Sequence, residues 1–344
     1  MAEALKDRFG ADVPAWIGGR FAAVLPDFDT DGFVAACLEG YEELELTPRA
    51  RHISDALAVH LPADRGRAME IIVESLGPED EELVGMEGFR YLPHVFFVAE
   101  HGLDHFDAAM VAQYELTKRF TAEFSIRAFI GKYPEQTLAA LRTWTDDPNE
   151  HVRRLVSEGT RPRLPWAPRL RAFQADPAPV IELLELLKDD PAEYVRRAVA
   201  NNLNDIAKDH PELAVEVAGR WWTDADDNRR RLIRHGLRTL IKAGDPGALA
   251  VLGYGTDNPA VLGAVDISPP DPAIGDSVRL EVEVRNPSDE AIAALVDLRV
   301  HFVKANGSTS PKVFKFKDFQ LAAGSTEPCR RKLDMVVLST RKLY

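Results

Sequence analysis

The stretch DDPAEYVRRAVANNLN, residues 189–204, occurs in three related copies, and this repetition decides the fold. The other copies are DDPNEHVRRLVSEGTR (146–161) and DADDNRRRLIRHGLRT (224–239). Each copy opens with acidic residues, continues with two or three arginines, and then spaces apolar residues three or four positions apart. Acidic residues suit a helix N-terminus, and apolar residues at this spacing form one buried stripe. The repeat therefore predicts helices that stack in pairs into a HEAT-like α-solenoid with a concave binding surface.

The helical pattern runs from about residue 47 to residue 255, and a different pattern follows beyond residue 260. There, apolar residues alternate with polar ones in four runs, within 278–284, 296–302, 314–316 and 333–337. Period-two alternation with Asn-Pro and Asn-Gly turns predicts short antiparallel strands. The predicted fold class is therefore mainly α: a HEAT-like α-solenoid followed by a small immunoglobulin-like β-sandwich.

A length of 344 residues suits two domains. We predict that residues 1–260 form the HEAT-like repeat domain and residues 265–344 the β-sandwich. The proline-rich stretch 269–272 is expected to be a linker or the entry to a strand. The chain ends soon after a strand-like run, which leaves open whether the β-sandwich is complete.

The charge of the chain is unevenly distributed. The formal net charge is −13, which on average argues against a nucleic-acid binder. Arginines nevertheless gather at 151–172, with one acid among them, and at 228–242, with none. No apolar run is long enough to cross a bilayer, and the N-terminus lacks the pattern of a secretory signal. With two distant cysteines, Cys37 and Cys329, one disulfide is possible, but a reducing cytoplasm fits best.

The repeats also superpose polar positions: an arginine is followed four residues later by an acidic or polar residue. A further copy of this pair lies 35 residues upstream of the first, in KRFTAEFSIRAF (118–129). Residues four apart share one face of a helix, so each copy predicts a row of polar side chains. The four rows are Arg119, Glu123 and Arg127; Arg154, Glu158 and Arg161; Arg197, Asn201 and Asp205; and Arg231, His235 and Arg238.

A single row of this kind is commonly an exposed ion pair worth about 0.3–0.5 kcal/mol. Four rows in register instead favour one binding groove, because solenoids use one face for binding. Guanidinium groups along a groove suit the phosphates of a DNA backbone. The predicted DNA-binding arginines are Arg119, Arg154, Arg161, Arg197, Arg231 and Arg238.

Three carboxylates, Glu123, Glu158 and Asp205, stand among these arginines. Acids repel phosphates, so a pure DNA binder should avoid them. They suit a reaction in which positive charge must be stabilised, such as glycosidic cleavage through an oxocarbenium-like sugar. Trp166, in a loop rich in prolines, is either a core anchor or an aromatic face against a cationic base.

Several long motifs resemble those of one enzyme family. They are HGLDHFDAAM (101–110), KRFTAEFSIRAFI (118–130), DDPNEHVRRLVSEGTRPRLPWAPRL (146–170) and VRRAVANNLNDIAKDHP (195–211). In this order they resemble the AlkC branch of the HEAT-like-repeat DNA alkylation repair glycosylases. The likeness covers most of residues 45–255, and some members carry a C-terminal immunoglobulin-like domain.

The resemblance implies excision of positively charged alkylated bases, such as 3-methyladenine and 3-methylcytosine, from duplex DNA without base flipping. By resemblance, Glu123, Glu158 and Asp205 fall on the family's active-site carboxylates. Arg154, Arg161 and Trp166 fall on positions that contact DNA or the lesion. We expect a monofunctional glycosylase of base excision repair, a cytoplasmic monomer associated with the bacterial nucleoid on DNA. No metal, cofactor or membrane is expected to take part.

Two alternatives stay open. A non-catalytic HEAT-repeat module could bind nucleic acid or protein through the same groove, in which case the carboxylates are replaceable. A glycosylase homologue could also have drifted to other lesions, such as bulky adducts. Other enzyme classes find little support, since the sequence has no GKS or GKT phosphate loop and no HExxH motif.

Overall fold

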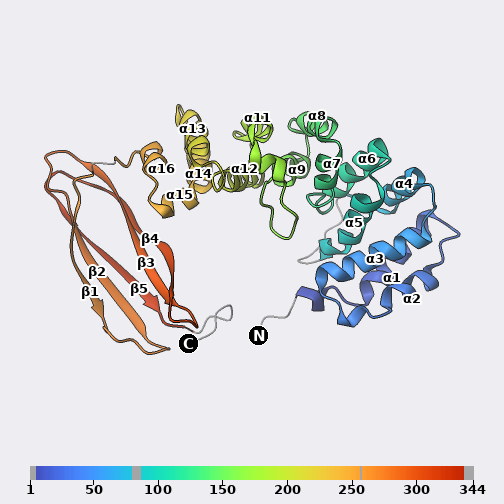
Figure 1. The fold of residues 1–344 in the computed structure, drawn as a ribbon, viewed down its shortest axis with the longest axis horizontal. Coiled ribbons are helices and arrows are strands. Elements are labelled where there is room, and N and C mark those ends of the chain that lie inside the picture. The colour runs from blue at the N-terminus through green and yellow to red at the C-terminus, as the bar shows by residue number, and fades with distance from the viewer. Residues whose placement is uncertain (1–4, 80–86, 256–257, 337–344) are drawn as a thin grey trace. The chain divides into compact units, whose positions relative to one another are not determined.

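The computed structural model describes residues 5–79, 87–255 and 258–336 (Figure 1). Helices occupy the described chain as far as residue 251, and strands follow from residue 261, which confirms the predicted mainly α class with a C-terminal β region. The short 3₁₀ helices are η1 (Leu5–Arg8), η2 (Tyr41–Glu43) and η3 (Glu87–Tyr91). The α-helices are α1 (Asp12–Val24), α2 (Thr30–Leu38), α3 (Leu46–His60), α4 (Arg65–Ser75), α5 (Leu92–His101), α6 (Phe106–Thr117), α7 (Ile126–Lys132), α8 (Pro134–Trp144), α9 (Glu150–Gly159), α10 (Arg171–Ala175), α11 (Ala178–Leu187), α12 (Glu193–Ile206), α13 (Pro211–Trp222), α14 (Asp227–Gly236), α15 (Arg238–Ala243) and α16 (Pro246–Val251).

Contacts within the chain group it into two units. The first runs to Asp209 and takes in Asp226–Gly236, so it holds α1 to α12 and α14. The second comprises His210–Ala225 and the chain from Leu237 onward, so it holds α13, α15, α16 and the strands. No helix among the described residues has the length and apolar character that a membrane span requires.

The repeats fold into α9, α12 and α14, which lie side by side in that order (Figure 1). Each helix buries the apolar stripe that the sequence predicts: Val152, Leu155 and Val156 on α9; Val195, Ala198, Val199 and Leu203 on α12; Leu232 and Ile233 on α14. The side chain of Asn149 accepts a hydrogen bond from the His151 amide and caps α9. Gly236 lets α14 approach α12 closely, because a Cβ there would come within 2.9 Å of Leu203.

The helical region begins earlier than the pattern predicts. α1 and α2 precede residue 47, and α1 packs against α4. Arg49 on α3 is buried and donates hydrogen bonds to the carbonyls of Lys6, Phe9 and Leu44. These bonds tie the beginning of the described chain to the helices that follow.

His94 makes the stability of this region depend on pH. Its ring is buried against Phe21, and burial with the nearby charge of Arg20 lowers the pKa of His94 to about 3. The unfolded chain binds a proton at this site below pH ~6.5, whereas the folded protein does not until about pH 3. We therefore expect this group to lower the free energy of unfolding by about 1.4 kcal/mol per pH unit as pH falls through that window.

Urea denaturation of the wild type and of His94→Phe between pH 7 and pH 4 measures this effect. The variant lacks the titrating group, so its stability should fall less steeply with acidification. Parallel curves for the two proteins would contradict the assignment.

The β region contains five described strands in two antiparallel sheets. The strands are β1 (Val261–Ser268), β2 (Ser277–Arg285), β3 (Ile292–Val303), β4 (Thr309–Leu321) and β5 (Thr326–Asp334). One sheet has the order β1-β2-β5 and the other pairs β3 with β4. The small core of the β region consists of Val282, Val284, Ala294, Leu321 and Cys329, from both sheets. Cys37 and Cys329 are both buried free thiols, so the possible disulfide is not formed.

The prediction of four strands was wrong. β1 precedes the prolines at 269–272, which therefore connect β1 to β2 and do not join two domains. β1 was missed because it is exposed along its whole length and shows no clear alternation of apolar and polar residues. The last strand is also placed earlier than predicted, at Thr326–Asp334, and Val337 lies outside the described residues.

Candidate active site

A pocket of about 430 Å³ in the first unit brings together five of the predicted site residues: Glu123, Glu158, Arg154, Arg161 and Trp166. η3, the turn between α6 and α7, α9, the loop after α9, and α12 all contribute to it. Its described lining residues are Phe89, Phe120, Thr121, Glu123, Phe124, Arg154, Glu158, Arg161, Leu164, Pro165, Trp166 and Tyr194.

Two arginines bridge the carboxylates of the pocket. Arg154 Nη1 lies 2.6 Å from Glu123 Oε2, and its Nη2 lies 3.7 Å from Glu158 Oε1. On the other side of Glu158, Arg161 Nη1 lies 2.6 Å from the same Oε1 atom. Burial lowers the pKa of each arginine, but the neighbouring carboxylates outweigh it and raise both pKa values overall. The pocket therefore holds alternating fixed charges in which the anionic oxygens sit beside permanent cations.

Asp205 extends this network behind the pocket. Its Oδ2 accepts a hydrogen bond of 2.8 Å from Arg161 Nε, and its Oδ1 accepts one of 2.8 Å from Lys208 Nζ. The Asp205 side chain is 1% exposed, and it is not among the residues that line the pocket. In this structure Asp205 contacts the pocket through Arg161.

The loop that carries Arg161 and Trp166 is fastened by Arg127. This arginine is buried on α7 and donates to the carbonyls of Gly159, Arg161 and Pro168, at 3.1, 2.7 and 2.5 Å. Burial, reinforced by Arg161, lowers the pKa of Arg127 to about 10, so it stays charged at neutral pH. Arg127 therefore has a structural role beneath the site.

The predicted row of Arg119, Glu123 and Arg127 on one helix face was wrong. α6 ends at Thr117, and Glu123 lies in the turn before α7. The Thr121 hydroxyl accepts from the Glu123 amide and donates to its carboxylate, a local pairing that competes with helix formation. Arg119 is not among the residues that line the pocket, and it donates to the Gly77 carbonyl and to Glu115.

Trp166 is 69% exposed, so it is not the core anchor that the sequence left open. Its backbone φ is 63°, in the left-handed region that non-glycine residues seldom adopt. Such a conformation costs on the order of 1–3 kcal/mol and is typical of functional sites. The loop thus presents an indole ring at the mouth of the pocket at a cost in backbone energy.

Aromatic side chains that the sequence analysis missed complete the pocket. Tyr194 on α12 stacks on Arg154, with 5.3 Å between the guanidinium carbon and the ring centroid. Phe89, Phe120 and Phe124 also line the pocket. Tyr194 had a sequence signal, because it aligns with His151 directly before Val-Arg-Arg, and the two rings pack at 5.5 Å. Phe120 and Phe124 flank Glu123 in the motif at 118–129, which was a signal, whereas Phe89 had none because it lies on a separate element.

The other predicted arginines lie elsewhere. Arg197 and Arg231 line a second pocket of about 220 Å³ on α12 and α14, together with Arg196. Asn201 and His235, at aligned positions of the same two helices, lie with 3.0 Å between Asn201 Oδ1 and His235 Nε2. Arg238 begins α15 in the second unit.

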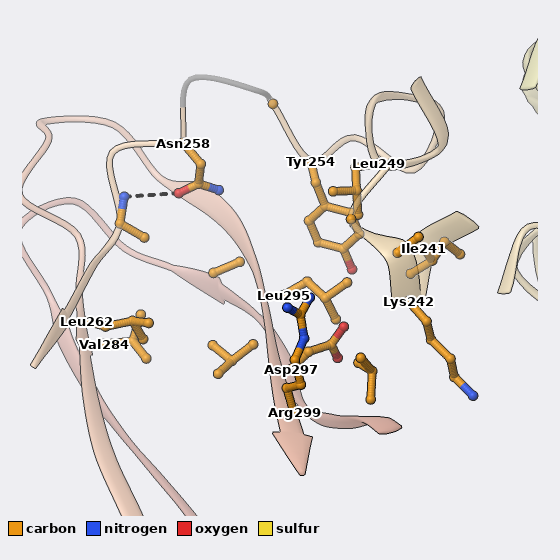
Figure 2. Close-up of a pocket in the computed structure, with 17 residues that line it drawn as sticks. Ile241, Lys242, Leu249, Tyr254, Asn258, Leu262, Val284, Leu295, Asp297 and Arg299 are labelled. Carbon is orange, nitrogen blue, oxygen red and sulfur yellow. Dashed lines mark hydrogen bonds between the residues drawn. The ribbon is translucent and has the colours of Figure 1, made fainter. Parts of the chain in front are cut away.

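A larger pocket of about 620 Å³ lies within the second unit, between α15, the chain around Tyr254, and the strands (Figure 2). Figure 2 shows Leu295, Asp297 and Arg299 along β3, and the hydrogen bond of 3.0 Å from the Ala260 amide to Asn258 Oδ1. Burial raises the pKa of Asp297 against the opposing charges of Lys315 and Lys242. Among the described residues that line this pocket Asp297 is the one carboxylate, so it lacks the paired carboxylates of the first pocket.

One group among the described residues has metal-ligand chemistry. Oxygen or nitrogen atoms of Asp55, Glu100 and His101 lie within 4.8 Å of one another. Glu100 also pairs with Arg51, and both carboxylates belong to exposed residues. None of the three residues lines the pocket that holds Glu123 and Glu158. The expectation of a metal-free reaction stays a prediction.

Comparisons with known proteins agree with this architecture. A family model described as "DNA alkylation repair enzyme" matches residues 111–238, and one for the C-terminal Ig-like domain of the uncharacterised protein YhaZ matches residues 262–344. Protein YhaZ of Bacillus subtilis (strain 168) is 33% identical over 341 residues, which cover 99% of this chain and 93% of that protein. The structure of the Pseudomonas fluorescens alkylpurine DNA glycosylase AlkC, bound to DNA containing an abasic site analog, matches with a TM-score of 0.90 and 35% identity. That match covers 99% of this chain and 93% of the other.

Proposed function

The chain belongs to the DNA alkylation repair enzyme family, with the AlkC architecture that its motifs predict, and we propose that it is a DNA glycosylase. Its proposed substrates are positively charged alkylated bases in duplex DNA, released by hydrolysis of the N-glycosyl bond. One observation carries the proposal: Glu123 and Glu158 lie in one pocket with exposed aromatic rings and bridging arginines.

The chemistry follows from where charge develops. A cationic alkylated base is already a good leaving group, so the enzyme need only stabilise the sugar as it becomes oxocarbenium-like. Glu158 is our first choice for the carboxylate that stabilises this sugar or positions the attacking water, and Glu123 lies in the same pocket. Asp205 is proposed to act through Arg161, whose side chain it holds. Trp166 and Tyr194 offer faces to a cationic ring.

The specific lesions are proposed from the resemblance of the motifs. They are 3-methyladenine and 3-methylcytosine, excised without extrusion of the base from the duplex. Release of each free base from defined duplexes that carry one lesion measures this range. Absence of both products, with release of another cationic base, would keep the glycosylase but reject these substrates.

Duplex DNA is the proposed partner, and the relative AlkC was solved with DNA bound. We propose that Arg154, Arg161, Arg197 and Arg231 contact the backbone, and Arg238 likewise from the second unit. Arg197→Ala and Arg231→Ala should each weaken binding about equally for damaged and intact duplexes, and each should reduce the slope of log K against log salt by about one. Fluorescence anisotropy across a salt series measures both quantities. A loss confined to damaged DNA would contradict a backbone role.

The reaction is proposed to stop at the abasic site. A lyase step needs an amine that forms a Schiff base with the sugar, and no lysine is among the described residues that line the pocket. We therefore expect an intact strand after excision and no covalent adduct on borohydride treatment. Gel electrophoresis of the labelled strand, before and after hot alkali, checks this, and cleavage before alkali would reject the monofunctional assignment.

A further inference from the structure

The pocket that holds Glu123 and Glu158, called the lesion pocket from here on, has one lining residue from the N-terminal part of the chain. Phe89 lies on η3, and its ring centroid is 5.2 Å from that of Phe120, which also lines the pocket. Gly88 fits beneath that ring, because a Cβ there would come within 3.2 Å of Phe120. The placement of η3 therefore decides where this aromatic wall stands.

η3 is attached to α1 through the next residue, Arg90. Arg90 Nη2 lies 3.0 Å from Asp12 Oδ2, and its guanidinium carbon lies 5.6 Å from the ring centroid of Trp16. The last residue of η3 contacts the same helix, because the rings of Tyr91 and Trp16 meet edge to face with their centroids 5.3 Å apart. Asp12 and Trp16 are one helical turn apart, so a charged group and an aromatic face on one side of α1 both contact Arg90. We call these contacts the clamp.

We propose that Asp12 and Trp16 of α1 act through Arg90 as positioning residues for Phe89 in the lesion pocket. This gives the N-terminal helix a part in the reaction that it does not touch directly. The inference rests on the proposed function for its catalytic consequence, whereas the clamp itself stands on the contacts of Arg90.

The physical reason is the precision that the pocket requires. A ring displaced by about 1 Å in a site that positions the reacting groups can cost up to about a hundredfold in rate. The contacts of Arg90 are partly exposed, so their loss should disturb the position of η3 more than the global stability. Loss of the Arg90 side chain is therefore expected to slow base release in a protein that is still folded.

The chain offers a matched control for the experiment. Arg20 also lies over Trp16, at 5.0 Å, but it belongs to α1 itself, so its contact with that ring lies within one helix. Arg90→Met should increase amide hydrogen exchange at residues 87–91 and lower the single-turnover rate of base release about tenfold. Its affinity for duplex with an abasic site analog should change less than about threefold. Arg20→Met should leave all three quantities near those of the wild type.

Two further comparisons exclude a general loss of structure. Trp16→Phe, which keeps an aromatic face, should restore most of the rate that Trp16→Ala loses. Arg90→Met combined with Phe89→Leu should be no slower than Phe89→Leu alone, because both changes act on the same ring.

The outcomes separate this inference from the proposed function. Equal exchange in Arg90→Met and Arg20→Met overturns the clamp. Faster exchange at 87–91 in Arg90→Met with an unchanged excision rate overturns the positioning role. If the wild type releases no base, the proposed function fails. The positioning role in excision then fails with it, whereas faster exchange at 87–91 in Arg90→Met alone still supports the clamp.

Discussion

Glu158→Gln is expected to lower the single-turnover rate of base release by about 10²–10⁴-fold while DNA affinity stays within about threefold. Glutamine keeps the shape of the side chain and an oxygen that can accept from Arg161, which also remains paired with Asp205. What is lost is the negative charge that is proposed to stabilise the developing sugar cation. The arginines elsewhere in the first unit that are proposed to contact DNA are untouched by this change.

Glu150→Gln is the matched control for that experiment. Glu150 is an exposed acid on the same helix, α9, and it is outside the pocket. The Glu150→Gln variant should release the base at a rate within about twofold of the wild type, because a surface substitution leaves the site intact. An equal loss of excision and binding in Glu158→Gln would sink the catalytic assignment, since it would indicate a structural defect.

Arg127→Met is expected to have the largest effect on stability, about 3–5 kcal/mol in the free energy of unfolding. The substitution removes the donor to two buried carbonyls, of Gly159 and Arg161, and to the more exposed carbonyl of Pro168. Because the same loop carries Arg161 and Trp166, excision should also fall below detection. Urea denaturation measures the stability, and the excision assay measures the second effect.

Arg142→Met provides the control for Arg127→Met. Arg142 pairs with Glu182 across an exposed surface at 3.5 Å, so its removal should cost less than about 0.5 kcal/mol. If Arg127→Met were no less stable than Arg142→Met, the role of Arg127 in holding the loop would be wrong.

The repeats explain how much of the site could be predicted from the sequence. α9, α12 and α14 each carry the full motif, so one alignment placed Arg154, Arg197 and Arg231 on neighbouring helices. The predicted row of Arg119, Glu123 and Arg127 was wrong because the motif there is only partial. The Thr121 hydroxyl pairs with the backbone and side chain of Glu123, and a turn forms in place of a helix. Glu123 reaches the pocket all the same, from the turn.

Features that depend on distant segments escaped prediction. Phe89 lines the pocket from η3, far from α9 in the sequence, and no local pattern encodes that placement. β1 was missed for a different reason, since an edge strand exposed along its length has no buried face to impose alternation. The N-terminal helices lack the repeat motif, so their contacts with α4 and η3 emerge only from the structure.

The most direct test of the central claim is chromatographic analysis of bases released from methylated duplex DNA by the wild type and by Glu158→Gln. The account predicts that the wild type releases 3-methyladenine or 3-methylcytosine and that the variant does not. No release by the wild type, with salt-sensitive DNA binding intact, would contradict it and favour a non-catalytic binding module.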